Sequence, residues 1–245
     1  MLRANFMITF MVLFSISMMG QTFKREQQGY TRVREAYSEK EAIVKKMLAD
    51  KKIDNMNIDV FLRVFKQEKI IEVWAKKKSD LSYTFITNYQ HCSSSGELGP
   101  KRKQGDMQTP EGFYYIDRFN PFSNFYLSLG VNYPNQSDRI LGEKNNLGGD
   151  IFIHGSCVTI GCIPITDDKI KELYIFAVEA KNAGQSKIPV YIFPTKDFET
   201  LLKNNSSNEQ LIAFWNNLKI GYDYFEKEHK LPTVSVNVDG KYIFK

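Results

Sequence analysis

Between residues 58 and 194 the chain is divided into short runs of aromatic and β-branched residues, with turn-forming residues between them. The runs at residues 58–65 and 69–75 flank a short polar turn and predict a β-hairpin. The other runs that fit strands are residues 83–89, 113–116, 125–129, 150–154 and 190–194. This spacing predicts a mainly β fold of the α+β class, built as an antiparallel β-sandwich or partial barrel.

Helical patterns lie on both sides of these runs and once within them. Apolar residues recur three or four positions apart at residues 31–51, as on an amphipathic helix. Within the β-rich region, Thr166 is a suitable N-cap for a helix that Gly184 would end. Residues 198–203 and 209–228 also read as helices.

Three parts are therefore predicted. They are an N-terminal helical segment at residues 21–57, a β-rich domain at 58–194, and a C-terminal helical extension at 195–245. The extension ends in a predicted hairpin around Asp239-Gly240. Its pattern is compatible with a lid, a partner surface or simple packing.

The first 20 residues have the pattern of a secretory signal peptide. Arg3 precedes a mostly apolar run at residues 6–19, and polar Gln21 follows Gly20. The apolar run is short for a membrane span. We expect cleavage near Gly20 and an exported, periplasmic protein; the alternative is an uncleaved leader that anchors the chain in the membrane.

The net charge of +5 is modest and spread along the chain. It is compatible with an anionic polymer as partner and gives no case for nucleic-acid binding. Three cysteines are an odd number for an exported protein, so at least one stays unpaired or pairs between chains. A chemical role for a free thiol is therefore favoured.

The segment at residues 151–162 brings a histidine and a cysteine close together in sequence. His154 ends an apolar strand, and Gly161-Cys162 follows within eight residues. A cysteine with a pKa of about 8.5 is a weak nucleophile at neutral pH, and a neighbouring imidazole can activate it. Gly161 permits close backbone approach, and the amides of Gly161 and Cys162 are candidates for an oxyanion hole. Pro164 places Cys162 on a loop before the next helix.

Two other readings of the same residues remain open. Cys157 and Cys162 could form a disulfide, which would remove the nucleophile. Alternatively, His154 and both cysteines could bind zinc together with His91 or Cys92. We predict no metal and no cofactor, and we expect Cys157 to be a buried loop residue.

The two motifs Ile153-His154-Gly155 and Thr159-Ile160-Gly161-Cys162 resemble the L,D-transpeptidase catalytic domain family of bacterial cell-wall enzymes. The nearest pattern is the murein branch with a short spacing between histidine and cysteine. The resemblance runs from about residue 60 to 194. Its further motifs lie in the same order at residues 99–106, 109–114, 120–123, 132–135 and 148–150.

The resemblance implies a reaction on peptidoglycan stem peptides. Cys162 would attack a peptide carbonyl and form a thioester, and His154 would move the proton. The carbonyl of Gly155 would orient the histidine. An amine from a second stem peptide completes a transpeptidation, whereas water completes a hydrolysis.

This chain departs from the usual family pattern in three ways. Ile160 stands where most members have a second histidine, and Pro164 stands where Arg or Asn is common. The long loop between histidine and cysteine is also missing. The acceptor is therefore open, and hydrolases that trim stems or release wall-bound protein are alternatives, as is a non-catalytic wall-binding protein.

Three consecutive basic residues, Lys101, Arg102 and Lys103, lie in a Gly-rich loop. The simplest reading is a solvated turn. The functional reading makes Lys101 and Arg102 receive carboxylates of a wall peptide. Asp106 and Glu111 could instead serve as glycosidase carboxylates, but no partner spacing supports that reading.

Overall fold

The structure is a computed structural model that describes residues 23–245. The predicted signal peptide lies outside the described residues. The helices are α2 (Thr31–Ala49), α3 (Gln136–Leu141), α4 (Asp167–Asn182), α5 (Phe198–Asn204) and α6 (Glu209–Glu228). The strands are β1 (Ile58–Phe65), β2 (Ile70–Lys77), β3 (Thr84–Gln90), β4 (Gly112–Asn120), β5 (Ser128–Val131), β6 (Phe152–His154), β7 (Ile163–Pro164), β8 (Ile188–Phe193), β9 (Val234–Val236) and β10 (Tyr242–Phe244).

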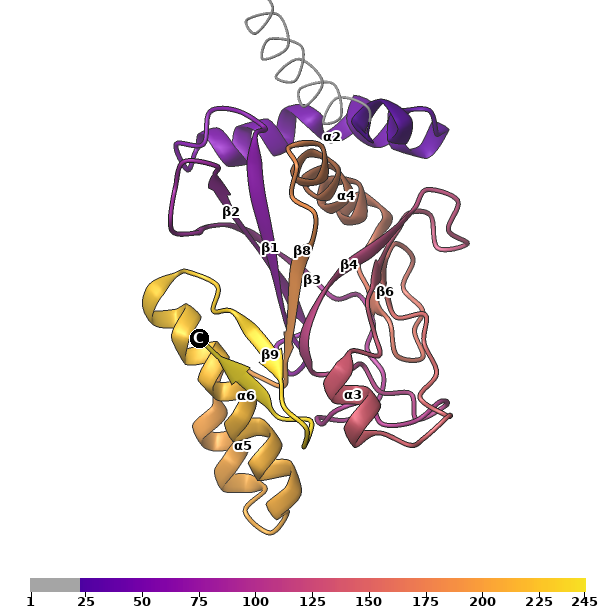
Figure 1. Cartoon of the computed structure of the whole chain (residues 1–245). Coiled ribbons are helices and arrows are strands. Elements are labelled where there is room, and N and C mark those ends of the chain that lie inside the picture. Colours follow the sequence, from indigo (N-terminus) through magenta and orange to yellow (C-terminus); the bar gives the residue numbers. More distant parts are fainter. Residues whose placement is uncertain (1–22) are drawn as a thin grey trace, which may run out of the picture.

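Strands β1 to β8 form one curled sheet with the order β3-β2-β1-β8-β4-β5-β6-β7, a half-barrel that the helices surround (Figure 1). Five neighbouring pairs are antiparallel, while β1–β8 and β6–β7 are parallel. The predicted mainly β, α+β class and partial barrel are confirmed. The sheet is mixed rather than purely antiparallel.

One face of the sheet packs against α2 and α4 (Figure 1). Thr166 caps α4, since its side chain accepts a hydrogen bond from the amide of Lys169. Every residue of this helix from Glu172 to Ala180 is buried, so its middle turns are covered on all sides. A hydrogen bond from Tyr37 to Glu179 (2.8 Å) joins α2 to α4 inside this core.

The other face packs against the C-terminal extension through a second, aromatic core. Trp215 of α6 is fully buried there, and its indole N–H donates to Glu111 at 2.8 Å. Glu111 also accepts from the amide of Gly99 and pairs with Lys66. The extension is thus tied to the loop before β4 and to the end of β1.

Most predicted elements are present, with three differences. The predicted strand at residues 125–129 begins only at Ser128, because Tyr126 has a positive φ of 70° and a turn at Ser123 precedes it. Helix α3 and the two-residue strand β7 were not predicted. Asn135 caps α3 through a capping box with Asp138, a signal that involves Asp rather than the usual Glu or Gln.

No helix within residues 23–245 combines the length and the apolar character needed to span a membrane.

Candidate active site

His154 is the last residue of β6 and lies between two neighbouring strands. It is paired with Ser128 of β5 and with Pro164 of β7, and its side chain is 1% exposed. Its Nδ1 lies 2.5 Å from the carbonyl oxygen of Gly155, the contact that the resemblance implied. Because a carbonyl oxygen can only accept, we assign the proton to Nδ1, which leaves the lone pair on Nε2.

Gly155 leaves no space for a side chain. A Cβ at this position would lie 2.9 Å from the carbonyl oxygen of Phe125 and 2.5 Å from the carboxylate of Asp167. That same carboxylate accepts a hydrogen bond from the amide of Ser156 at 2.7 Å. The residue after the histidine is therefore fixed between the turn before β5 and the first turn of α4.

Cys162 directly precedes β7. Ile153 and Ile163 are partners in the parallel β6–β7 pair and both face the core. Cys162 lies outside β7, but extending the strand alternation back by one residue directs its side chain away from the core face of Ile163, to the same side as His154. The Cys162 thiol is unpaired, and its Sγ lies 3.4 Å from the carbonyl oxygen of Asp150.

Burial keeps both groups neutral. It lowers the pKa of His154, although the hydrogen bond to Gly155 partly opposes this change. It raises the pKa of the Cys162 thiol, and the charge of Asp150 adds to that effect. A backbone hydrogen bond at Phe152 and the positive charge of Lys101 act to lower the same pKa. Both shifts favour a thiol and a neutral imidazole over a thiolate–imidazolium pair.

The turn before Cys162 is closed by Thr159. Its hydroxyl donates to the carbonyl oxygen of Cys162 at 2.7 Å and accepts from the amide of Gly161 at 3.1 Å. Gly161 has a φ of +136°, and a Cβ there would lie 3.0 Å from the carbonyl oxygen of Gln108. A glycine is thus needed here, but its amide, predicted as an oxyanion donor, is already bonded to Thr159.

The other two cysteines form a disulfide, Cys92–Cys157. Both are exposed, so the expected buried position of Cys157 is wrong, and so is its alternative pairing with Cys162. The zinc reading also fails, because the two sulfurs are bonded to each other. Within residues 23–245 no group of three or more His, Cys, Asp or Glu side chains is arranged to hold a metal ion.

The pairing was missed because Cys92 is 65 residues from Cys157 in sequence. The structure brings them together where the chain leaves β3. There the amide of Cys92 donates to the carbonyl oxygen of Pro164 at 3.1 Å. This contact lies beside β7, so the disulfide connects the end of β3 to the loop between His154 and Cys162.

Cys162 lines a cavity of about 340 Å³ with Lys66, Lys69, His91 and the loop at residues 93–98. Burial lowers the pKa of His91 to about 4, and its Nε2 is buried without a hydrogen-bond partner. Sequence reasoning did not identify this lining. The one available signal was the length and Ser/Gly content of the loop that begins at Ser93, because long loops of this kind are commonly functional.

Residues 59–192, more than half of the chain, match the YkuD family, described as the L,D-transpeptidase catalytic domain. This chain belongs to that family. A relative from Escherichia coli (strain K12), named "Putative L,D-transpeptidase YafK", is 37% identical over 190 residues. The alignment covers 77% of this chain and 74% of the relative. The resemblance seen in the sequence is confirmed.

Two solved structures show a weaker likeness. Pgp2 from Campylobacter jejuni, described as a helical cell shape determining protein, has a TM-score of 0.45 and 18% identity, covering 74% of this chain and 73% of that one. L,D-transpeptidase 1 from Mycobacterium tuberculosis has a TM-score of 0.31 and 13% identity, covering 55% of this chain and 62% of that one.

In this L,D-transpeptidase family domain the departures from the usual pattern have clear positions. Ile160 is exposed at 78%, on the tip of the loop before Gly161. Pro164 is the second residue of β7 and is paired with His154, so it is part of the sheet and not of a substrate loop.

The structure separates the three basic residues of the Gly-rich loop. Lys101 is buried and its amine bonds to Asp106 and to the carbonyl oxygen of Lys103. Burial acts to raise the pKa of Asp106, but the bonds from Lys101 and from backbone amides lower it overall. The solvated-turn reading is therefore wrong for Lys101. Arg102 faces a different cavity from that of Cys162, and Lys103 is exposed.

Glu111 does not resemble a glycosidase acid. It is fully buried, and both of its oxygens are occupied by Gly99, Lys66 and Trp215. Its contacts connect the C-terminal extension to the family domain, so its role in this structure is architectural.

Proposed function

We propose that this chain is a cysteine acyltransferase that acts on peptidoglycan stem peptides through a thioester at Cys162. The proposal is carried by one free thiol directly before β7 and a buried imidazole of fixed orientation that is paired with β7, which strand alternation directs to the same side. Membership of the L,D-transpeptidase catalytic domain family supplies the reaction class.

In the first step, Cys162 Sγ attacks a peptide carbonyl carbon of the stem, and the thiol proton passes to His154 Nε2. The resulting tetrahedral oxyanion collapses, the C–N bond breaks, and His154 returns the proton to the leaving amine. The acyl group remains on sulfur as a thioester. General-base assistance of this kind is worth about 10²–10⁴-fold in rate.

In the second step, an amine of another stem or a water molecule attacks the thioester. His154 takes the proton of the attacking group, and the Cys162 sulfur leaves and recovers it. The carbonyl of Gly155 supports His154 in both steps, because it accepts from Nδ1 and stabilises the transient imidazolium. Gly161 and Cys162 amides are the proposed oxyanion donors, and the Gly161 amide must first leave Thr159.

The charged residues that line the cavity beside Cys162 are Lys66, Lys69 and Glu97. Lys66 is already paired with Glu111, so Lys69 is the candidate contact for a substrate carboxylate. The partly exposed loop at residues 93–98 also contributes to the lining of this cavity, and Lys101 is close enough to Cys162 to lower the thiol pKa. Lys101 itself is paired with Asp106, so we propose for it an electrostatic role rather than a direct salt bridge with substrate.

We also propose an exported, wall-associated location. An exposed disulfide such as Cys92–Cys157 persists in oxidising compartments and is rare in reducing ones. The signal peptide at residues 1–20 and the boundaries at residues 57/58 and 194/195 stay predictions.

The decisive experiment is muropeptide analysis of purified sacculi incubated with the wild type and with Cys162→Ala. New cross-links indicate transpeptidation, and shortened stems indicate hydrolysis. We expect Cys162→Ala to lose either product by at least about 10³-fold, because the covalent route disappears. Val158→Ala, at an exposed position in the same loop, is the matched control and should keep its activity. Full activity in Cys162→Ala would exclude the proposal and favour a non-catalytic wall-binding protein.

A further inference from the structure

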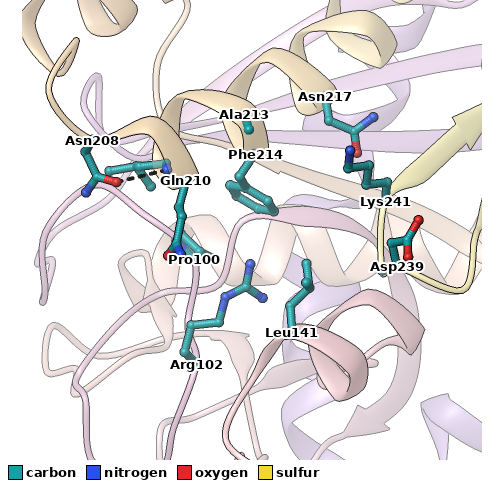
Figure 2. Close-up of a pocket in the computed structure, with 12 residues that line it drawn as sticks. Pro100, Arg102, Leu141, Asn208, Gln210, Ala213, Phe214, Asn217, Asp239 and Lys241 are labelled. Carbon is teal, nitrogen blue, oxygen red and sulfur yellow. Dashed lines mark hydrogen bonds between the residues drawn. The ribbon is translucent and has the colours of Figure 1, made fainter.

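A second, larger cavity of about 620 Å³ lies between the family domain and the C-terminal extension (Figure 2). Its walls are the loop at residues 100–102, the end of α3, the first half of α6 and the turn between β9 and β10. Phe214 and Leu141 give it an apolar floor, while Arg102 and Gln210 add polar groups. Cys162 does not line it.

Arg102 is the chemically distinctive residue of this cavity. Its guanidinium lies over the ring of Phe214, 5.1 Å from the centroid, and Figure 2 shows it directed toward that ring. Its Nη1 is buried and donates no hydrogen bond. The side chain as a whole is 28% exposed, so a carboxylate in the cavity would meet the other, exposed part of the guanidinium.

The nearest carboxylate does not satisfy Arg102. Asp138 Oδ1 lies 3.7 Å from Nη1, which is too far for a good hydrogen bond. The other oxygen of Asp138 accepts from Tyr114 at 2.9 Å and from the amide of Asn135 at 3.0 Å. Burial raises the pKa of Asp138 to about 6. Asp138 is therefore committed to capping α3 and provides an incomplete counter-charge.

The opposite rim carries one charge of each sign. Lys241 and Asp239 both come from the β9–β10 turn (Figure 2). No ion pair involves Lys241 within residues 23–245. With Arg102, the lining itself holds two cations and one carboxylate, and Asp138, outside the lining, lies beside Arg102. Arginine is well suited to bidentate binding of carboxylates.

We propose that this cavity binds a carboxylate of a peptide, with Arg102 as the principal contact, Phe214 and Leu141 under the apolar part of the ligand, and Lys241 at the rim. The C-terminal extension then forms one wall of a ligand site. That the peptide is a stem of the wall polymer rests on the proposed function.

One segment connects the two cavities. Leu98 lines the cavity of Cys162, whereas Pro100 and Arg102 line the second cavity. Lys101 lies between them and influences the pKa of Cys162. A polymer with several stems could therefore be held at Arg102 while another stem reacts at Cys162.

The test is calorimetric binding of a soluble stem tetrapeptide to the full chain carrying Cys162→Ala, which prevents turnover. The comparison ligand is the same peptide with its carboxylates amidated. We expect Arg102→Gln to weaken binding by about tenfold or more, in the range of one charge-assisted hydrogen bond. Lys103→Gln, an exposed cation one residue away, is the matched control and should change the Kd less than about twofold.

Lys241→Glu provides a second variant at an exposed position, where misfolding is not expected; we expect it to weaken binding about fivefold. The amidated peptide should bind as weakly as the Arg102→Gln protein binds the acid. Equal affinities for acid and amide, or equal losses for Arg102→Gln and Lys103→Gln, would overturn the proposal. Acylation is measured separately, by the mass of the intact protein that retains Cys162. Arg102-dependent binding without thioester formation in that protein would refute the proposed function alone, and acylation there without Arg102-dependent binding would refute this inference alone.

Discussion

Cys157 and Cys162 lie five residues apart in one loop and have opposite properties. Cys157 is exposed and bonded to Cys92, whereas Cys162 is partly buried and free. The disulfide joins the end of β3 to the loop, while the free thiol directly precedes β7, whose Pro164 is paired with His154. In our proposal the same loop uses one sulfur to hold its shape and the other as the nucleophile.

The difference comes from the neighbours of each sulfur. Cys157 lies past the tight turn at Gly155–Ser156, where Asp167 holds the backbone, and reaches a partner distant in sequence. Cys162 is placed by Thr159, whose hydroxyl bonds to the amide of Gly161 and to the carbonyl oxygen of Cys162, and by its position ahead of β7. Reactivity thus depends on local backbone contacts as well as on the residue type.

Replacing His154, the proposed base for Cys162, should cause the largest loss of activity. His154→Gln should lower kcat/KM for the stem peptide by about 10²–10⁴-fold, because Cys162 loses its base. His91→Gln is the matched control, since His91 also lines the Cys162 cavity but has no place in the proposed proton transfer. For His91→Gln, the loss of kcat/KM should stay below about tenfold. Steady-state kinetics with both variants will show which imidazole serves Cys162, and a larger loss in His91→Gln would contradict our assignment.

Removing the disulfide should give a smaller effect on activity and a clear effect on stability. The bond closes a loop of 65 residues, and native disulfides typically contribute about 2–4 kcal/mol. For a domain of this size, Cys92→Ser/Cys157→Ser should lower Tm by roughly 5–15 °C. At temperatures below the Tm of the double variant, we expect kcat/KM to fall by about tenfold, because the loop at residues 155–161 is no longer linked to β3.

Calorimetric scans and kinetics of this double variant, compared with the wild type under oxidising conditions, provide the measurement. Cys162 would then be the single thiol of the chain. An unchanged Tm together with unchanged kinetics would show that the disulfide does not support the site.

The sequence was most informative where contacts are local. His154, Gly155, Gly161 and Cys162 lie within nine positions, so strand alternation and turn chemistry were enough to place them near one another. The Thr166 cap of α4 and the hairpin of β1 and β2 were likewise readable, because each signal is contained in a few residues.

Long-range contacts escaped the sequence reading. The parallel pairing of β1 with β8 joins Leu62 to Val190, and no local pattern specifies it. The Cys92–Cys157 disulfide and the Glu111–Trp215 hydrogen bond also join residues that are far apart in sequence. Arg102 could be suspected as a carboxylate site, but the cavity around it exists only because α6 returns to the loop before β4.

The central claim is that neutral His154 takes the proton of Cys162. Because burial lowers the pKa of His154, the base stays unprotonated to a lower pH than an ordinary histidine, and activity is lost only as it protonates. The direct measurement is the pH dependence of kcat/KM for Cys162 acylation by a stem peptide, followed by mass spectrometry of the intact protein. We predict an acidic limb centred below about pH 6.5, absent in His154→Gln. A limb at or above pH 7, or one that is unchanged in His154→Gln, would contradict the account.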